Sequence, residues 1–129
     1  MPNTEQLCRF LKDHEGIFRL LPTFVPRRMG VAGRRLRLHP DDYFALGIER
    51  GSIQERWFSS IISAINGPLA PSDEGISYVD MGGDEKTSLK EFVETLGEEL
   101  LGAEMIRTYG TWPMYSKFFD YEGPLFHHL

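Results

Sequence analysis

Hydrophobic side chains recur every three to four residues along TSLKEFVETLGEELLG, residues 87–102, and the polar side chains fall between them. This spacing places the apolar positions on one face of a helix. Ser88 and Glu91 have the spacing of a capping box, and Gly102 offers a left-handed stop. We therefore predict one helix here, with its apolar stripe formed by Leu89, Phe92, Val93, Leu96 and Leu100.

Other segments carry the pattern of β-strands. GRRLRLHPDD alternates leucine with arginine, which is typical of a half-exposed strand. ERWFSSIISAI is rich in β-branched and aromatic residues and is followed by the turn signal Asn66-Gly67-Pro68. Strands are thus expected at residues 35–39, 55–65, 75–81, 114–121 and 123–129, the last two lying near each other, with TYGTW as a loop before them.

The N-terminal segment predicts a short helix followed by an extended arm. Thr4 is placed to cap the helix. Pro22 and Pro26 then lack backbone donors, which confines the arm to extended or edge-strand conformations. We divide the chain into residues 1–26, the helix and arm, and residues 27–129, the main part. The predicted fold class is mainly β with helices, α+β.

Composition narrows the classes of partner. The chain has 129 residues, a formal net charge of −5 and one cysteine, Cys8. The negative charge argues against nucleic-acid binding, since that needs a basic surface. A single cysteine excludes an intrachain disulfide and a multi-cysteine metal site. No secretion signal or membrane-spanning apolar run is visible, so we expect a cytoplasmic protein that binds neither nucleic acid nor membrane.

Two polar clusters have ordinary structural explanations. His39-Pro40-Asp41-Asp42 is typical of a helix entry, where proline and acidic residues are favoured, more than of a catalytic site. A basic cluster suits either phosphate or a solvated surface. Its members are Arg27, Arg28, Arg34, Arg35 and Arg37.

Lys117 interrupts the apolar run at residues 114–119. Such a lysine either extends to solvent along its aliphatic stem or lies on the sheet face opposite the aromatic side chains, or lines a polar cavity. Glu55, Arg56 and Trp57 begin a predicted strand, where an outward-facing Glu–Arg pair is the usual arrangement.

The chain closes on His127 and His128, two of its four histidines. Imidazole is the commonest neutral metal ligand, but adjacent strand residues point to opposite faces. His128 would share a face with a residue at position 130. Two histidines fall short of a three-ligand zinc site, so an exposed terminal pair without a function stays open as the alternative.

Taken in order, the motifs from residue 27 onward resemble the first part of type I phosphomannose isomerases, members of the cupin superfamily, and their bacterial relatives. The order is more specific than any single motif. The matching segments are Gly33-Arg34-Arg35-Leu36, Glu55-Arg56-Trp57, Asn66-Gly67, Ser88-Leu89-Lys90-Glu91, Leu100-Leu101-Gly102, Trp112 to Phe118, and Gly123 to Leu129.

The resemblance implies a partial cupin-type double-stranded β-helix and a metal centre. In the family, the strand after the Lys-Phe segment carries Gln-x-His, two zinc ligands. His128 stands at the glutamine position, and the family's histidine would fall just past Leu129, so we expect an N-terminal portion of a longer cupin that stops within its metal-binding strand. His127 and His128 are thus the predicted metal residues, for zinc or another divalent metal.

The resemblance also implies a substrate site. Lys117 matches the family's lysine beside the sugar phosphate, and Glu55 and Trp57 match positions bordering the active-site side of the barrel. In the complete enzymes, a metal polarises the sugar oxygens while a base moves a proton between C1 and C2, as in mannose 6-phosphate to fructose 6-phosphate. We expect these residues alone to be inactive.

Two other hypotheses remain open: a non-catalytic cupin module that binds sugar or metal, and an ordinary small α+β domain in which the motifs are coincidental. A double-stranded β-helix needs further strands to close its core. The chain is therefore expected to be marginal alone or to form a homodimer.

Overall fold

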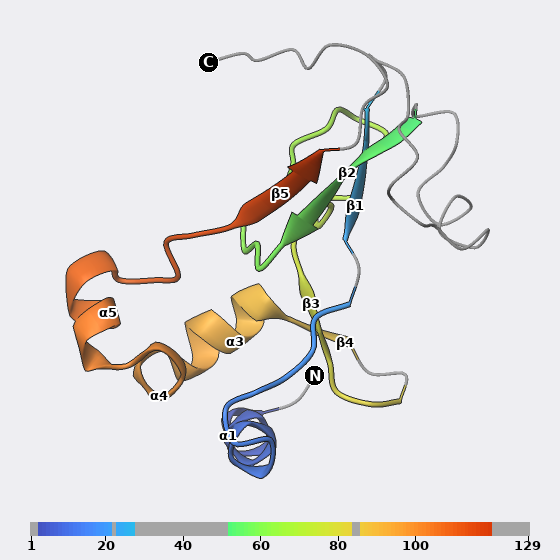
Figure 1. The fold of residues 1–129 in the computed structure, drawn as a ribbon. Helices are drawn as coiled ribbons and strands as arrows, with labels where there is room; N and C mark the ends of the chain where they lie inside the picture. The colour runs from blue at the N-terminus through green and yellow to red at the C-terminus, as the bar shows by residue number, and fades with distance from the viewer. Residues whose placement is uncertain (1–2, 22, 28–51, 84–85, 120–129) are drawn as a thin grey trace.

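The computed structural model describes residues 3–21, 23–27, 52–83 and 86–119. These residues combine helices with small antiparallel sheets, a mixed α+β arrangement (Figure 1). In chain order the elements are α1 (Thr4–Asp13), β1 (Phe24–Arg27), β2 (Ser52–Phe58), β3 (Tyr78–Asp80), β4 (Lys86–Ser88), α3 (Leu89–Leu96), α4 (Glu98–Leu101), α5 (Ala103–Tyr109) and β5 (Ser116–Phe119).

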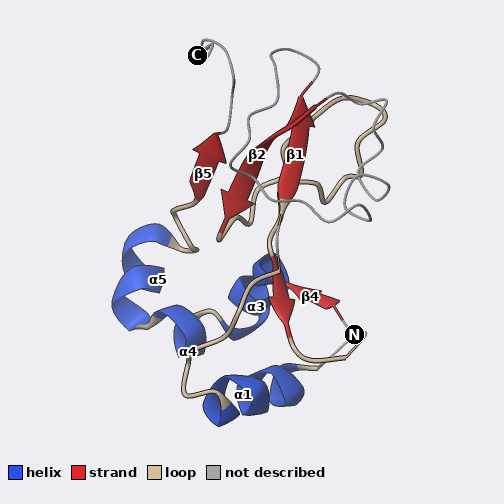
Figure 2. Ribbon diagram, turned by 45° about the vertical axis from the view of Figure 1, so that its right-hand side comes forward, coloured by secondary structure: helices blue, strands red, loops and turns tan. Residues whose placement is uncertain are grey.

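The strands form two separate antiparallel sheets. One has three strands in the order β1-β2-β5, and the other is the β3–β4 pair. Figures 1 and 2 show the three-stranded sheet at one end of the molecule and the helices toward the other, with β3 and β4 between them. Because β5 follows α5 in the chain, the polypeptide leaves the sheet after β2, builds the helical part and returns to pair with β2.

The helical part is held together by a small apolar core. Leu7, Val79, Phe92 and Leu96 are buried together. The ring of Phe18, from the segment after α1, stacks on Phe92 with centroids 5.6 Å apart. The apolar stripe predicted for residues 89–96 is therefore the face that α3 buries. Residues from both parts of the chain, before and after residue 27, meet in this core.

Local signals account for the ends of the first helices. Asn3, not Thr4 as predicted, caps α1, because its side chain accepts from the Gln6 backbone while the Gln6 side chain accepts from the Asn3 backbone. The Ser88 hydroxyl accepts from the Glu91 backbone at 3.0 Å, as predicted for the serine of a capping box.

Three expectations for the elements are wrong. The single helix over residues 87–102 is interrupted at Gly97, whose φ of 46° ends α3 before α4 begins. The loop expected at TYGTW, residues 108–112, begins two residues later, because α5 (Ala103–Tyr109), a helix that was not predicted, extends to Tyr109. The strand predicted at residues 55–65 begins at Ser52 and ends at Phe58, because Ser59 has a φ of 52° that turns the chain out of the sheet.

The edge-strand prediction for the proline-rich arm is confirmed. β1 lies at an edge of the three-stranded sheet, and its register with β2 shifts between Val25 and Pro26. An edge strand tolerates proline because the missing backbone donor is not needed by a second neighbour. The strand expected at residues 75–81 is present as the shorter β3, Tyr78–Asp80. The strand predicted at residues 35–39 lies outside the described residues.

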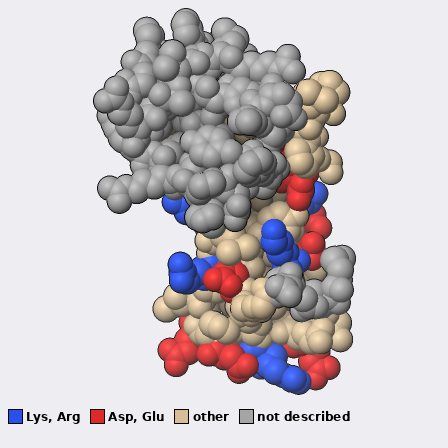
Figure 3. Space-filling model, turned by 90° about the vertical axis from the view of Figure 1, so that its right-hand side faces the viewer, with Lys and Arg blue, Asp and Glu red and all other residues tan. Residues whose placement is uncertain are grey.

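Acidic and basic side chains are both visible on the described part of the face in Figure 3. Exposed ion pairs within the described residues include Arg9 with Glu5 at 3.3 Å. No helix within the described residues is long and apolar enough to cross a membrane.

Candidate functional site

Glu55 and Trp57 lie on one face of β2, two residues apart. Both side chains are buried, 3% and 5% exposed, and the Trp57 indole Nε1 donates to Glu55 Oε1 at 3.0 Å. A strand presents alternate side chains to the same face, which is why the Glu-x-Trp spacing brings these two together. The carboxylate therefore fixes the orientation of the indole.

The prediction of an outward-facing Glu–Arg pair on this strand is wrong. Arg56 points to the opposite face from Glu55, and its guanidinium lies 4.6 Å from the ring centroid of Phe58 and 5.9 Å from that of Phe24. The pair does not form because Glu55 is buried on the covered face of the strand, the face that also carries Trp57.

Lys117 reaches this face from β5. The antiparallel register pairs Lys117 with Trp57, so the two side chains lie on the same side of the sheet. The Lys117 Nζ lies 4.1 Å from the Trp57 ring centroid and 5.3 Å from that of Tyr115, within the range of a cation–π interaction. Lys117 is thus half-buried and lies on the same face as the Trp57 and Tyr115 rings. A position on the face opposite the aromatic side chains was one of the arrangements expected from the sequence, and it is not the one observed for these two rings.

Tyr115 completes the group, which we call the lysine–aromatic cluster: Glu55, Trp57, Tyr115 and Lys117. The Trp57 and Tyr115 rings stack with centroids 5.8 Å apart and an interplanar angle of 23°. Tyr115 is 44% exposed, so the cluster has a solvent-facing side. The three substrate residues predicted from the sequence, which are up to 62 positions apart, therefore lie in one place.

Lys117 supplies the positive charge of the cluster, and Glu55, its carboxylate, is 3% exposed and engaged by the Trp57 indole. Within the part of the chain that the structure describes, Lys117 is ion-paired with no carboxylate, and its ammonium is held by the faces of two rings. Aromatic faces attract a cation without neutralising its net charge. A lysine in this setting can still donate charge-assisted hydrogen bonds to a phosphate or carboxylate that approaches from solvent.

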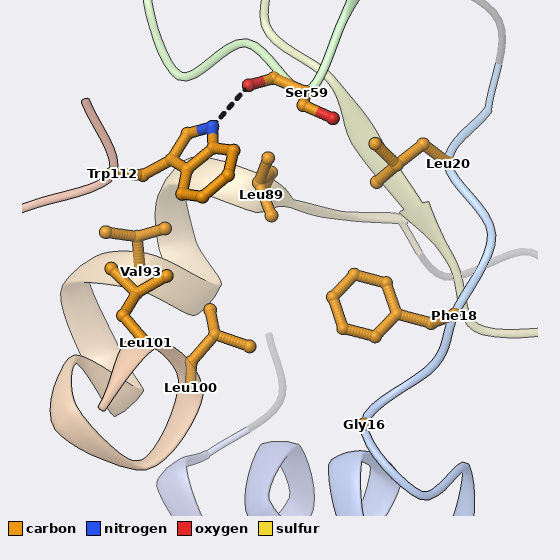
Figure 4. A pocket seen from close by; sticks show the side chains of 9 residues that line it. All are labelled: Gly16, Phe18, Leu20, Ser59, Leu89, Val93, Leu100, Leu101 and Trp112. Atoms are coloured by element: carbon orange, nitrogen blue, oxygen red, sulfur yellow. Dashed lines mark hydrogen bonds between the residues drawn. The ribbon is translucent and has the colours of Figure 1, made fainter. Parts of the chain in front are cut away.

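A pocket in the helical part has different chemistry from the cluster (Figure 4). Its volume is ≈ 250 Å³, and Trp112 on one side donates from Nε1 to the Ser59 carbonyl at 2.8 Å. None of its lining residues carries a charge, so it lacks the cation that a bound anion would require. The residues that line it are Gly16, Phe18, Leu20, Ser59, Leu89, Val93, Leu100, Leu101 and Trp112.

The predicted metal residues, His127 and His128, lie outside the described residues, as do the His39 motif and most of the arginine cluster. Among the residues that are described, no three His, Cys, Asp or Glu side chains are grouped closely enough to hold a metal ion. The metal centre remains a prediction from the sequence.

Sequence reasoning did not single out Tyr115 or Gly75 for this site. Tyr115 shares a face with Lys117 because they are two residues apart, a signal that was available in the sequence. Gly75 lies against the Trp57 ring, and no local pattern in the sequence predicts this contact.

No protein-family model, curated protein or solved structure matches this chain. The resemblance to phosphomannose isomerases therefore stays a prediction from the ordered motifs of the sequence.

Proposed function

We propose that the lysine–aromatic cluster binds the phosphate of a sugar phosphate, within the N-terminal part of a cupin-type protein related to metal-dependent sugar-phosphate isomerases. One observation supports this proposal most directly. The Lys117 ammonium, the Trp57 indole and the Glu55 carboxylate, assigned to substrate by the sequence resemblance, lie together although they come from two distant segments.

The chemistry of each group fits an anionic carbohydrate. Lys117 supplies a positive charge for a phosphate dianion. The half-exposed ring of Tyr115 offers an apolar face beside it. Glu55, engaged by the Trp57 indole, holds the rings on which the ammonium lies. The role proposed for these residues is binding and orientation, and no step is routed through a metal.

Isothermal titration calorimetry with mannose 6-phosphate tests the binding role. We expect binding by the wild-type chain, and Lys117→Gln should weaken it at least about tenfold, or about 1.4 kcal/mol. Lys90→Gln is the matched control, because Lys90 is an exposed lysine on α3 that faces Glu94 at 4.0 Å. It should bind like the wild type.

Mannose and inorganic phosphate then separate the two halves of the ligand. If inorganic phosphate binds and mannose does not, the anion is the part of the ligand that is recognised, as proposed. An equal loss of affinity in both lysine variants would mean that overall charge, and not Lys117, attracts the ligand, and would overturn the assignment.

Catalysis is a separate question with its own assay. With zinc and mannose 6-phosphate, residues 1–129 are expected to form no fructose 6-phosphate, because the metal ligands of the family lie in part beyond them. If a longer chain that includes those ligands binds mannose 6-phosphate but does not convert it, the result favours the non-catalytic module. Turnover by residues 1–129 would contradict the expectation.

A further inference from the structure

Gly75 makes an unusually close approach to the Trp57 ring. Its φ is +91°, and a Cβ built on it would lie 2.9 Å from both Cε3 and Cζ3 of Trp57 and 3.0 Å from the Ala64 backbone nitrogen. Real Cβ atoms are essentially never found this close to other heavy atoms. Only glycine lets the backbone lie so near the six-membered ring of the indole.

The loop that carries Gly75, residues 59–77, is fastened on both sides of this contact. Asn66 Nδ2 donates to the Pro26 carbonyl of β1 at 2.7 Å and to Glu74 Oε1 at 2.9 Å. The Ala64 nitrogen donates to the Glu74 carbonyl at 2.7 Å. Glu74, next to Gly75, is 7% exposed. The loop therefore cannot move away from Trp57 without breaking partly buried hydrogen bonds, which costs stability.

The Trp57 ring in turn fixes the position of the Lys117 ammonium. Its nitrogen is held by Glu55, its six-membered ring meets Gly75, and Lys117 Nζ lies 4.1 Å from a ring centroid. An indole that shifts carries the cation–π surface with it. A displacement of residue 75 that shifts the indole therefore also changes the position of the Lys117 ammonium.

We propose that Gly75 is a positioning residue for Lys117: the absence of a side chain lets loop 59–77 press on the indole and set where the ammonium stands. Its effect on ligand affinity rests on the proposed function, whereas its effect on Lys117 does not. Gly75 itself touches no ligand in this arrangement.

Gly75→Ala and Gly67→Ala form a matched pair for the test. Both glycines lie in the same loop with a φ of +91°, but a Cβ at Gly67 meets nothing within 4 Å. Backbone strain is therefore common to both variants, and only Gly75→Ala pushes on Trp57. The readout is the upfield ring-current shift of the Lys117 ε-methylene in NMR, together with mannose 6-phosphate affinity.

We expect the Lys117 signal to move toward its unshifted position in Gly75→Ala and to stay in place in Gly67→Ala, with affinity falling roughly tenfold, or about 1.4 kcal/mol, in the first variant alone. An unchanged Lys117 signal in Gly75→Ala overturns the positioning role. If the signal moves as expected but the wild type binds no mannose 6-phosphate, the proposed function fails and the positioning role stands.

A Trp57→Phe background covers the case in which Gly75→Ala does not fold. The smaller ring removes the two indole atoms that a Cβ would meet, while the contact with the Ala64 nitrogen remains, so Gly75→Ala should fold in this background and cost less stability than it does with Trp57 present. Failure to fold in both backgrounds would show that the glycine serves the loop and not the indole, and would overturn the proposal.

Discussion

The side chain of Thr87 carries a buried hydroxyl that is not hydrogen-bonded within the described residues. It is 0% exposed in β4, and within the described residues its Oγ1 has no hydrogen-bond partner. A buried hydroxyl without a partner costs stability that a methyl group of the same shape does not. Thr87→Val should therefore raise the free energy of unfolding by about 1 kcal/mol, measured from urea denaturation with an unchanged slope. Thr87→Ser, which keeps the hydroxyl and removes the methyl group, should lower it. A less stable Thr87→Val variant would mean that the hydroxyl is satisfied.

Tyr78 illustrates how one neighbour changes a titration. Its hydroxyl donates to Asp73 Oδ2, and this hydrogen bond, with burial and the negative charges of Asp73 and Glu91, raises its pKa from 10.0 to about 12. Because the folded-state pKa is the higher one, the interaction stabilises the fold fully below pH 10 and the benefit is lost as the pH rises toward 12.

The stability difference between the wild type and Tyr78→Phe should accordingly be constant from pH 7 to about pH 9 and shrink above pH 10. Urea denaturation at several pH values measures it. Asp73→Asn weakens the cause and should bring the Tyr78 pKa, followed by ¹³C NMR at Cζ, back toward 10.0. A Tyr78 that already titrates near that value in the wild type would contradict the prediction.

At the scale of elements, local signals predicted what local interactions build. α3 was found because its apolar stripe and its serine cap agree, although the helix was predicted to continue past Gly97. α5 was missed because it buries none of its residues and has no side-chain cap, so neither periodicity nor capping marks it. The β2 strand was placed too late because Ile62 and Ile65 read as strand residues, yet they are 51% and 88% exposed in the loop. Tertiary contacts of loop 59–77 override that preference.

Asn66 makes two of those contacts, and the sequence marked it only as a turn residue. Its amide donates to the Pro26 carbonyl and to Glu74 Oε1, which ties the loop to β1. Asn66→Ala should lower the free energy of unfolding by about 1–3 kcal/mol, because both bonds are lost. Asn66→Asp has nearly the same shape but replaces a donor with a carboxylate facing two acceptors, so it should be worse than alanine. Urea denaturation compares the two, and an aspartate variant as stable as the wild type would contradict these donor roles.

For the whole molecule, the sequence resemblance singled out Glu55, Trp57 and Lys117, but it predicted neither their arrangement nor the contacts of Tyr115 and Gly75. The period of two in a strand places Glu55 and Trp57 on one face, where we had expected an outward-facing Glu–Arg pair. That Lys117 joins them depends on the register of β5 against β2, a pairing across more than fifty residues that no local pattern specifies. The contact with Gly75 depends on the same long-range packing. The site is therefore a property of the assembled sheet and loop.

The first helix buries one of its residues, Leu7, and packs three partly buried side chains, Cys8, Phe10 and Leu11, against the same core. Leu7 is 2% exposed and packs in the core with Val79, Phe92 and Leu96. Leu7→Ala removes buried methyl groups from this cluster and should lower the free energy of unfolding by about 2–5 kcal/mol. Ile17→Ala is the control, because Ile17 is 77% exposed, and should change it by less than about 0.5 kcal/mol.

Two signals show whether this loss is felt throughout the molecule. Far-UV circular dichroism reports the helices, and tryptophan fluorescence in a Trp112→Phe background reports Trp57, which is buried on β2 of the three-stranded sheet. If the helical part and the sheet unfold as one cooperative unit, both transitions should move together to lower urea in Leu7→Ala. This is expected because the chain passes from the sheet into the helices and back through β5, so neither part is continuous in sequence. A fluorescence transition that stays in place while the helical signal moves would show that the sheet folds independently.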